Sequence, residues 1–593
     1  MPGMSRLVAR TREVLQTEGP MAVVRYAKRY LRRHRMYKVE IDEQELAAQR
    51  KASFPQAITI SILVPLYNTP EPFLKEMIDS VTAQTYGGWE LCLADGSDAQ
   101  HADVGEYCQA RAQQDQRIKY RRLSRNGGIS ENTNACIDMA TGEYIALFDH
   151  DDLLVPSALY EVMKAICEQG ADYVYTDEAT FRSPDRTKII TAHFKPDFAP
   201  DNLRTNNYIC HLSVFAREVL DAAGPFNKEY DGSQDHEMIM RLTEHAKKIV
   251  HVPKVLYLWR SHPNSTAADI GAKTYAIDAG KRAVRDQAAR HGMTAEVLSS
   301  RAFPTIYRVK YDVPEKKRVS IIICTRDHLD DLRKCVDSIL EKTTWPDYEI
   351  VVVDNGSKEQ ALFDWYEQMK KQLPGRFVVG LMDEPFNYPR LNNYGATLAS
   401  GEYLLLLNND TEVITPEWIE EMMMYVQRED VAAAGAMLYY GDRTIQHAGI
   451  ILGLGADHTA GHVFSKEPSE CVGYMGRACY AQDMTAVTAA CMLTKASVWQ
   501  KLHGMDEQLA VAFNDVDYCM RARKAGYLVV WTPFAELYHY ESKSRGADTT
   551  GDKAQRLKAE AALFRKRWEA ELAAGDPYYN PNFSLEYTDF SLR

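Results

Sequence analysis

Four landmarks of the first half of the chain recur 259 residues later in the second half (320 − 61, 393 − 134, 401 − 142, 410 − 151). The pairs are Ser61 and Ser320, Asn134 and Asn393, Gly142 and Gly401, and Asp151 and Asp410. Self-similarity at one fixed spacing over about ninety residues indicates an internal repeat rather than a chance likeness. The sequence therefore predicts a tandem duplication of one domain, with two versions of any site that the domain carries.

Each repeat begins with a strand and helix alternation. The apolar runs "ITISILVPLYN" and "VSIIICTRD" have strand length, and each precedes a segment with apolar residues at helical spacing. A second strand follows as "WELCLADGS" or "YEIVVVDNGS", and a third ends in an acidic or amide-rich turn. Continuous apolar strands that alternate with helices predict an α/β fold with a mostly parallel sheet, covered on both faces.

The amino-acid composition excludes several classes of protein. A net charge of −12 and 45% apolar residues are typical of a folded protein, and they argue against a nucleic-acid partner. The 11 cysteines are scattered without a C-x-x-C pair, which favours reduced thiols and a cytoplasmic location. No apolar run approaches the roughly 20 residues of a membrane span, and no signal-peptide core follows the basic N-terminus.

Three segments flank the repeats. Residues 1–57 form a predicted basic amphipathic arm, since Lys and Arg alternate there with apolar residues; it suits either peripheral contact with an anionic membrane or packing on the acidic body. Residues 269–317 are a predicted helical linker, whose helix stops at Gly292. Residues 549–593 are predicted to form a helix to about Ala574 and a tail packed on a domain surface.

Polar side chains follow the predicted strands, at the edge where ligands bind in parallel sheets. The run "LFDHDD" places Asp149, Asp151 and Asp152 directly after a buried strand. Carboxylates this close repel one another, so they favour a site for Mg²⁺ or Mn²⁺ with a bound diphosphate. The alternative is a polar turn before the helix that begins near Pro156.

The ordered motifs resemble a known family. "VPLYN", "ADGS", "GGISENTN", "FDHDD", "SQDHEMIMRL" and "RSHPNST" look like glycosyltransferase family 2 domains of the GT-A fold. In the second half, "ICTRD", "VDNGS", "LLNNDTEV", "FNDVDYCMRARKAGY" and "YHYESKSRG" resemble the rhamnosyltransferase-like branch of that family. The resemblance covers residues 58–268 and 318–548, and it implies two tandem GT-A domains with Rossmann-like, mostly parallel sheets.

The resemblance also implies donor-binding and metal-binding residues. The expected donor contacts are Pro65, Tyr67, Asn68, Asp95 and Asp149 in the first domain, and Thr325, Arg326, Asp327, Asp354 and Asn408 in the second. "ADGS" against "DNGS" leaves open whether Asp95 and Asp354 are equivalent. The D-x-D element corresponds to Asp149 and Asp151, and to Asn408 and Asp410. Because an amide brings no charge, we expect the second site to bind Mn²⁺ or Mg²⁺ more weakly.

In such enzymes a late acidic motif supplies the catalytic base, which implies Asp235 in "SQDHE" and Asp515 in "FNDVD". The alternative makes each of them a helix N-cap, and Glu237 and Asp517 are the substitute bases. In the same family a histidine approaches the metal or the leaving diphosphate, which implies His262 and His539, both in H-x-x-S sequences.

The second half contains an insertion. Asp515 follows Asp235 by 280 residues (515 − 235), so a net 21 residues are added after the D-x-D element. The glycine-rich stretch 443–481 accounts for much of it and contains His447, His458 and His462. The four-residue spacing of the last two would suit a metal pair on a helix, but the glycines argue against a helix there. We instead expect a mobile lid on the acceptor side.

The resemblance thus implies a bifunctional, inverting, metal-dependent glycosyltransferase. It would transfer sugars from UDP- or dTDP-sugar donors, with dTDP-rhamnose expected at the second site. The expected acceptor is a growing bacterial surface glycan such as O-antigen or capsule, free or lipid-linked, on the inner face of the cytoplasmic membrane. The alternatives are one catalytic domain beside a glycan- or nucleotide-binding module, and a non-catalytic glycan-binding scaffold. A sugar nucleotidyltransferase is disfavoured, since no glycine-rich triphosphate-binding segment follows the first strand.

Overall fold

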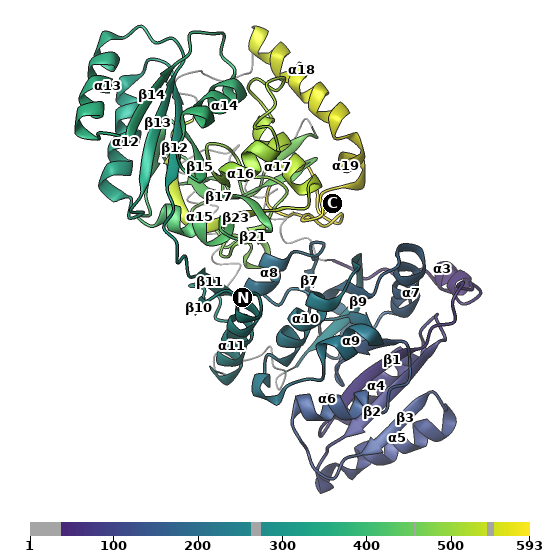
Figure 1. Ribbon diagram of the computed structural model, residues 1–593. Coiled ribbons are helices and arrows are strands. Elements are labelled where there is room, and N and C mark those ends of the chain that lie inside the picture. Colours follow the sequence, from purple (N-terminus) through teal and green to yellow (C-terminus); the bar gives the residue numbers. More distant parts are fainter. Residues whose placement is uncertain (1–36, 263–273, 456–457, 542–550) are drawn as a thin grey trace, which may run out of the picture.

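The computed structural model describes residues 37–262, 274–455, 458–541 and 551–593, which form two α/β lobes (Figure 1). The first lobe contains a nine-stranded sheet with the order β3-β2-β1-β4-β8-β6-β9-β5, and β7 pairs with β6. Its strands are β1 (Ile60–Leu66), β2 (Trp89–Asp95), β3 (Ile118–Arg122), β4 (Tyr144–Leu147), β5 (Leu153–Leu154), β6 (Tyr173–Arg182), β7 (Asp185–His193), β8 (Ser213–Ala216) and β9 (Ile249–Ser261).

The second lobe repeats that topology in a ten-stranded sheet with the order β14-β13-β12-β15-β22-β17-β23-β16, to which β18 and β21 are added. Its strands are β12 (Val319–Thr325), β13 (Tyr348–Asp354), β14 (Phe377–Leu381), β15 (Tyr403–Asn408), β16 (Thr411–Val413), β17 (Val431–Tyr439), β18 (Ile445–His447), β21 (Gln482–Asp483), β22 (Cys491–Lys495) and β23 (Leu528–His539). In both sheets the first four strands of the order are parallel, and β8 and β22 introduce antiparallel pairs.

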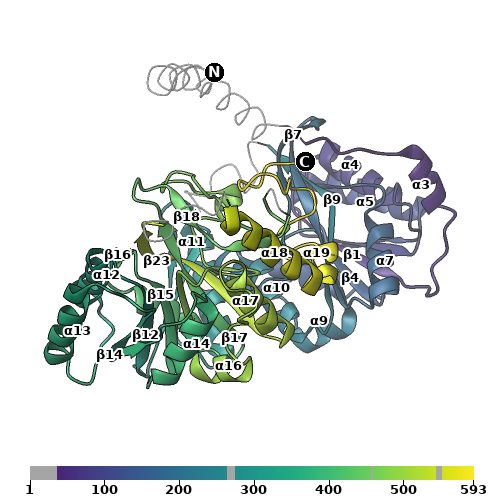
Figure 2. The ribbon, with the colours of Figure 1, turned by 90° about the horizontal axis from the view of Figure 1, so that it is seen from above.

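Helices cover the strands of each lobe (Figures 1 and 2). In the first lobe they are α3 (Glu43–Gln49), α4 (Glu71–Thr82), α5 (Ala102–Gln114), α6 (Ile129–Ile137), α7 (Ala158–Gln169), α8 (Pro200–Thr205), α9 (Arg217–Ala223) and α10 (Gln234–His245). In the second they are α12 (Leu329–Lys342), α13 (Gln360–Gln372), α14 (Tyr388–Leu398), α15 (Trp418–Val426), α16 (Ala496–Lys501) and α17 (Asn514–Lys524). Every residue of β1, β2 and β13 is buried, as expected for central strands covered on both faces.

A polar contact inside each sheet explains why the repeat keeps its landmarks. Ser61 Oγ donates to Glu90 Oε1 at 2.7 Å and accepts the Gly142 N–H at 2.9 Å. Ser320 repeats both contacts, with Glu349 at 2.6 Å and with the Gly401 N–H at 2.9 Å. A Cβ atom on Gly142 would lie 2.4 Å from the Thr59 carbonyl oxygen, so only glycine fits this approach.

The lobes are joined by a helix and a small hairpin. The predicted linker helix is α11 (Thr274–Arg290), and it leads into an antiparallel pair that the sequence analysis missed, β10 (Ala295–Ser299) and β11 (Tyr307–Tyr311). From this pair, Arg308 Nη2 donates to Glu421 of α15 at 2.5 Å. The hairpin therefore ties the linker to the second lobe.

The C-terminal region consists of α18 (Gly551–Arg567), α19 (Glu569–Ala574) and an extended tail. Phe583 and Phe590 of the tail are buried, and their rings contact each other with centroids 5.3 Å apart. The tail bonds to both lobes, because the Asp197 N–H donates to the Pro577 carbonyl at 2.7 Å and the Phe464 N–H to the Thr588 carbonyl at 2.7 Å. The tail thus packs against the junction between the lobes rather than on one surface.

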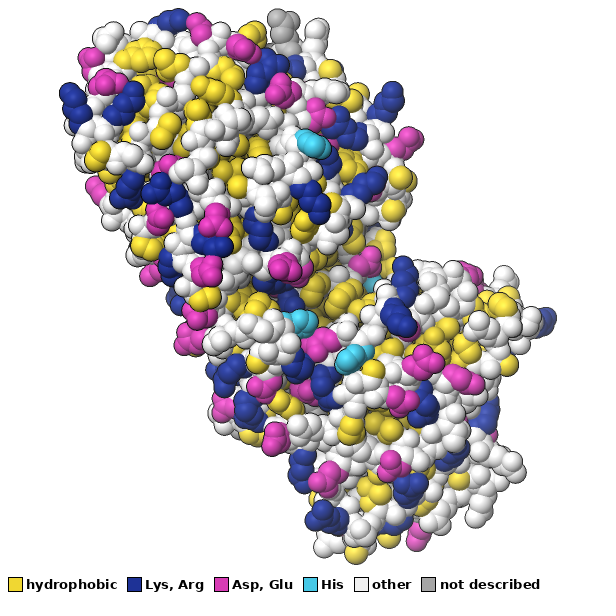
Figure 3. Space-filling model, viewed as in Figure 1, with side chains coloured by type: hydrophobic (Ala, Val, Ile, Leu, Met, Phe, Trp, Pro, Cys, Tyr) yellow, Lys and Arg dark blue, Asp and Glu magenta, His cyan; other side chains and the backbone are white. Residues whose placement is uncertain are grey.

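The predicted α/β class with two repeated sheet domains is confirmed, and the antiparallel strands in each sheet are an addition that apolar periodicity did not reveal. Residues 1–36 of the arm expected over residues 1–57 lie outside the described part of the chain. Within the described ranges, no helix is long and apolar enough to cross a membrane. All 11 cysteines are free thiols, as expected. On the face seen in Figure 3, basic and acidic side chains are interspersed over both lobes.

Candidate functional site

The first two strands of each sheet end in matching turns. Asn68 and Asp327 both have a positive φ, 49° and 51°, and each N–H donates to a serine hydroxyl of the next strand's turn, Ser97 at 2.9 Å and Ser357 at 2.6 Å. Asn68 also exchanges hydrogen bonds with Asp98. Of the other predicted donor contacts, Pro65 and Thr325 are buried at the strand ends, whereas Tyr67 and Arg326 are exposed.

Asp95 and Asp354 are equivalent, which resolves the alternative left open by "ADGS" and "DNGS". Each is the last residue of the second strand, paired with Leu66 and with Thr325. Each also accepts a tyrosine hydroxyl at 2.8 Å, from Tyr120 and from Tyr366. Burial raises the pKa of Asp95, but hydrogen bonds from Ser97, Tyr120 and Arg122 lower it overall, so Asp95 is a carboxylate.

The acidic turn of the first domain is organised by two residues that the sequence analysis did not select. His211 Nε2 lies 3.3 Å from Asp149 Oδ2, and the His211 ring stacks on Tyr257 with centroids 4.9 Å apart. The Tyr257 hydroxyl donates to Asp152 Oδ2 at 2.5 Å. The Arg260 N–H donates to Asp152 Oδ1 at 2.6 Å. Asp152 therefore holds the turn in place, and Asp149 faces His211.

The pKa values of Asp152 and Asp149 in this turn are shifted in opposite directions. Burial, followed by the charges of Asp151 and Asp149, raises the pKa of Asp152 well above its ordinary value. Burial also raises the pKa of Asp149, but the charge of His211 outweighs it and lowers that pKa overall. Burial lowers the pKa of His211, whereas Cys210 and Asp149 raise it well above its ordinary value. His211 and Asp149 thus form an ion pair.

Two of the three predicted metal residues of the first domain, Asp151 and His262, contact each other at the strand ends. His262 Nε2 is 2.9 Å from Asp151 Oδ2, directly beyond the end of β9. The His262 ring also contacts Phe73, with centroids 5.1 Å apart. Asp149 belongs to the same turn as Asp151, and its carboxylate faces His211.

The second domain keeps the histidine contact and changes its surroundings. His539 Nε2 lies 3.1 Å from Asp410 Oδ1 and 3.1 Å from Asn408 Nδ2. His539 Nδ1 faces Gln446 Oε1 at 2.6 Å, and Nε2 faces Asp410 and Asn408. A histidine that donates through one nitrogen to an amide oxygen is oriented as metal-binding histidines are.

The donor sets fit a divalent cation of the Mn²⁺ or Mg²⁺ type in an open site. Such ions are held by one or two carboxylates, with the rest of the coordination from substrate phosphate and water. Among the described residues, no group of three or more His, Cys, Asp or Glu side chains is arranged to hold a metal ion. The side chains at the strand ends are two carboxylates and a histidine in the first domain, and one carboxylate, one amide and a histidine in the second, where the amide Nδ2 of Asn408 faces His539.

Asp235 and Asp515 occupy the same place in the two domains. Each is the second residue of its helix, α10 and α17, and the N-cap residues are Ser233 and Phe513, so neither aspartate caps a helix as the alternative required. Asp515 Oδ2 accepts the Ala489 N–H at 3.0 Å. Burial and then the charge of Asp149 raise the pKa of Asp235, and despite opposing contributions from His211 and Gln234 it stands at about 6.

The two substitute bases are engaged in structural ion pairs. Glu237 bonds to Arg241 at 2.6 Å, and Asp517 bonds to Arg521 at 2.8 Å, each four residues further along its helix. Asp517 Oδ1 also accepts from Arg567 at 2.8 Å. Both carboxylates are buried beside these arginines, which favours Asp235 and Asp515 as the residues that face the site.

The insertion of the second domain lies between β18 and β22, as the shift in spacing predicted. It contains an antiparallel pair, β19 (Ile450–Leu452) and β20 (Ala460–His462). His458 lies outside any helix, with φ 46°, in agreement with the expectation that the glycines exclude a helical pair with His462. His462 Nδ1 instead lies 3.0 Å from His447 Nδ1, and burial lowers the pKa of both imidazoles. Backbone hydrogen bonds to Leu585 and Thr588 of the tail hold the described parts of this segment, and its predicted mobility stays a prediction.

His211 and Tyr257 were missed in the sequence analysis for the same reason. Sheet pairing places Leu537 and Ala490 of the second domain where Tyr257 and His211 stand in the first. A search for repeated landmarks finds only what both halves keep, so residues specific to one half escape it. A histidine and a tyrosine next to apolar runs carried no other signal.

Comparison with known proteins agrees with the motifs. The family model described as Glycosyl transferase family 2 matches residues 61–222 and 320–479, more than half of the chain. The protein y4gI of Sinorhizobium fredii, described as uncharacterized, is 43% identical over 90% of this chain. The O-antigen biosynthesis protein RfbC of Myxococcus xanthus is 36% identical over 90% of this chain. The chain spans 58% of the first relative's length and 41% of the second's.

Two solved structures overlap parts of the chain. S. aureus TarS 1-349 in complex with UDP-GlcNAc has a TM-score of 0.33 at 18% identity, over 39% of this chain and 66% of that one. GalNAc-T7 with UDP, GalNAc and Mn²⁺ has a TM-score of 0.37 at 14% identity, over 45% of this chain and 51% of that one. These partial overlaps carry no part of the argument that follows.

Proposed function

Because this chain belongs to glycosyl transferase family 2, we propose that it is a bifunctional inverting glycosyltransferase with one transfer site in each sheet domain. The donors are UDP- or dTDP-sugars, with dTDP-rhamnose at the second site. The acceptor is a growing bacterial surface glycan such as O-antigen or capsule. The name of the RfbC relative supports this product class.

The single observation that carries the proposal is the matched position of Asp235 and Asp515, each second in its helix at the strand-end edge. In each transfer the carboxylate accepts the proton of an acceptor hydroxyl, whose oxygen forms a bond to the anomeric carbon. The bond from that carbon to the diphosphate oxygen breaks, and the nucleoside diphosphate leaves with the electron pair. Attack opposite the leaving group inverts the anomeric configuration. Proton transfer of this kind contributes roughly 10²- to 10⁴-fold in rate.

We assign a divalent cation, Mn²⁺ or Mg²⁺, to each site. Asp149, Asp151 and His262 would hold it in the first domain, and Asn408, Asp410 and His539 in the second. When bound, the cation offsets the negative charge that develops on the departing diphosphate. The strand-end residues would orient the donor: Asn68 and Asp95 would contact its base and ribose, and Asp327 and Asp354, at the matching strand ends, would do so in the second domain.

The test is a pair of single-site variants, Asp235→Asn and Asp515→Asn, assayed against a panel of nucleotide sugars with oligosaccharide acceptors. We expect each variant to lose a different transfer step and to keep the other. Asp103→Asn and Asp330→Asn, at exposed positions of the two domains, are the matched controls.

The alternative with one catalytic domain has specific support, since the second site has Asn408 for Asp149 and Ala490 for His211. It would be correct if Asp515→Asn left every transfer intact and Asp235→Asn abolished all of them. A glycan-binding scaffold would be preferred if no nucleotide sugar raised the Tm of either domain in the presence of Mn²⁺.

A further inference from the structure

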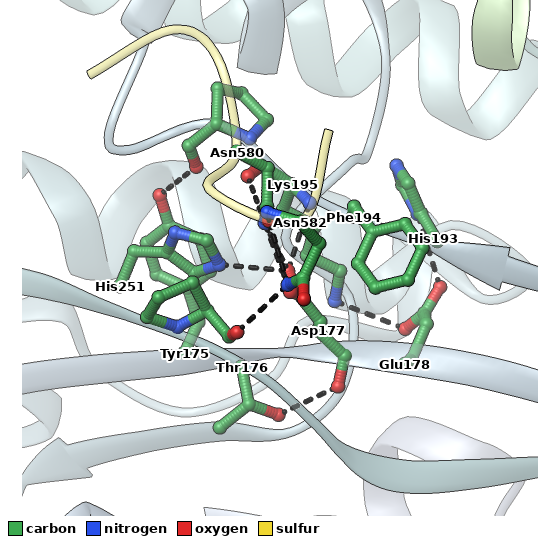
Figure 4. Close-up of polar contacts among 12 residues, drawn as sticks. Tyr175, Thr176, Asp177, Glu178, His193, Phe194, Lys195, His251, Asn580 and Asn582 are labelled. Carbon is green, nitrogen blue, oxygen red and sulfur yellow. Dashed lines mark hydrogen bonds and ion pairs between the residues drawn. The ribbon is translucent and has the colours of Figure 1, made fainter. Parts of the chain in front are cut away.

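The C-terminal tail reaches a buried polar cluster in the first domain (Figure 4). Asn580 is 2% exposed, and its Nδ2 donates to Asp177 Oδ1 at 3.1 Å, to Asp177 Oδ2 at 2.9 Å and to the Lys195 carbonyl at 2.9 Å. Asp177, in β6, also faces His251 Nε2 at 2.8 Å. A segment that follows the second domain in sequence therefore completes the hydrogen bonding of a carboxylate inside the first.

Lys195 connects Asn580 and Asp177 to the backbone next to His211. Its N–H donates to Asp177 Oδ1 at 2.8 Å, and its carbonyl accepts from Asn580 Nδ2. The side chains of Asp177 and Asn580 therefore both hold the Lys195 backbone. Its fully buried ammonium donates to Glu178 Oε2 at 3.1 Å, to the Ile209 carbonyl at 2.6 Å and to the His211 carbonyl at 2.6 Å. All three donors of the ammonium are used, which fixes the position of the group.

The two carbonyls flank Cys210, whose φ of 39° lies in the left-handed region that non-glycine residues rarely adopt. Lys195 binds the backbone on both sides of this residue, and so it stabilises the turn from which the His211 side chain projects. His211 Nε2 then lies 3.3 Å from Asp149 Oδ2. Direct contacts thus connect Asn580, Asp177, Lys195, His211 and Asp149.

We infer that the C-terminal tail is a positioning element of the first-domain site, acting through Asn580, Asp177 and Lys195 to hold His211 against Asp149. The inference rests on the proposed function for what Asp149 does. Asn580, Asp177 and Lys195 are positioning residues, since Asp149 and not they would meet the donor. Outer contacts of this kind typically change metal affinity or activity by roughly 10- to 100-fold.

The second domain lacks this arrangement, so the inference applies to the first domain only. Sheet pairing places Met437 and Leu438 where Asp177 and Glu178 stand in the first domain, and Ala490 where His211 stands. A tail contact with the cluster therefore bears on the first site alone. It also ties that site to the presence of the whole chain, because the tail follows the second domain.

The test uses Asn580→Asp in the full-length chain. The change keeps the side-chain shape and the Oδ1 acceptor of the tail turn, but it sets a carboxylate oxygen against Asp177. Glu586→Gln is the matched control, because it exchanges a carboxylate and an amide at an exposed position of the same tail. The double variant Asn580→Asp/Asp177→Asn restores an amide and carboxylate pair in reverse.

Two readouts are compared. We expect Asn580→Asp to lower kcat of first-domain transfer roughly 10- to 100-fold while second-domain transfer stays within about twofold, and the double variant to recover most of the loss. In spectra of protein with ¹³C-labelled histidine, the His211 signal, assigned by its loss in His211→Gln, should move in Asn580→Asp and not in Glu586→Gln. The His539 signal should stay unchanged in both variants.

The inference is overturned if Asn580→Asp leaves the His211 signal and first-domain transfer as in the wild type. An equal loss in both domains would also overturn it, since that indicates a general loss of stability. If Asn580→Asp does not fold, Asn580→Ala is judged by the same criteria. If the wild type transfers no sugar at all, the proposed function fails, and the His211 signal alone still decides the positioning role.

Discussion

Arg428 of the second domain donates through Nη1 to Asp201 Oδ1 of the first at 2.5 Å, and both side chains are buried. Arg204 donates to the same oxygen at 3.0 Å, and the Asp201 N–H donates to Asp483 Oδ2 at 2.8 Å. Burial raises the pKa of Asp201, but Arg428 and Arg204 outweigh it and lower that pKa to about 2. The domain junction therefore contains a charged, directional contact in addition to apolar packing, which favours one orientation of the two sheets.

We predict that Arg428→Met destabilises the protein by about 3–5 kcal/mol, because it leaves the Asp201 carboxylate buried with part of its countercharge removed. Denaturant unfolding of the full chain measures this. Lys358→Met is the control, since Lys358 pairs with Asp383 at an exposed position, with side chains 74% and 77% exposed, and such pairs contribute about 0–1 kcal/mol. Equal stability of Arg428→Met and wild type would mean that Arg204 alone neutralises Asp201.

A second prediction concerns the pH dependence of first-domain transfer. The base must be ionised to accept a proton, and burial and Asp149 bring the pKa of Asp235 to about 6. First-domain kcat/KM should therefore rise with pH up to about 6 and level off above it. A pH–rate profile between pH 4.5 and about 8 measures this, and a flat profile across that range would remove Asp235 as the base.

The same shift predicts an effect on stability. The folded-state pKa of Asp235 lies above the ordinary value of 3.8, so the stability it contributes is greatest at low pH and is lost as pH rises through about 6. Asp235→Asn should therefore raise the free energy of unfolding at pH 7.5, by at most about 3 kcal/mol for a shift of about two pKa units, and have little effect near pH 4. A variant that is less stable at both pH values would contradict this account.

Much of the fold could be predicted from local features of the sequence. Continuous apolar strands, the Gly142 and Gly401 turns and the shared spacing predicted two matching sheets, because these features are needed wherever such a domain folds. The antiparallel strand β8 was missed: its four residues, Ser213–Ala216, are too few for a clear period. Its place is fixed by pairing with β4 and β6, which lie far from it in sequence.

The candidate site likewise contains contacts that the sequence predicted and contacts that it did not. Motifs that both halves keep predicted the contacts of His262 with Asp151 and of His539 with Asp410. The Asn580 contact with Asp177 could not be predicted, since it joins residues 403 positions apart and depends on how the lobes and the tail pack. The glycines around His458 and His462 correctly predicted that these two residues do not share a helix.

A further prediction concerns acid stability. His236 is buried, donates through Nε2 to the Leu203 carbonyl at 2.6 Å, and burial lowers its pKa to about 4. As pH falls from 6.5 to about 4, the unfolded chain gains a proton there that the folded chain does not, so stability falls by about 1.4 kcal/mol per pH unit. Unfolding experiments on His236→Gln should show a shallower loss over this range. His291→Gln, at an exposed position, is the control and should leave the slope unchanged.

The last prediction exchanges the one carboxylate that distinguishes the two metal positions. Asn408 Oδ1 accepts from the Tyr388 hydroxyl at 3.2 Å, and its Nδ2, whose place a carboxylate oxygen would take, faces His539 at 3.1 Å. Asn408→Asp should tighten Mn²⁺ binding at the second site, and Asp149→Asn should weaken it at the first, each by roughly tenfold, because an added or removed charge changes the attraction to a divalent cation. Titration with Mn²⁺ and UDP, followed by the paramagnetic resonance of free Mn²⁺, measures both. If Asn408→Asp leaves the second affinity unchanged, then Asp410, His539 and the diphosphate already hold the cation, and the missing carboxylate does not explain the difference between the sites.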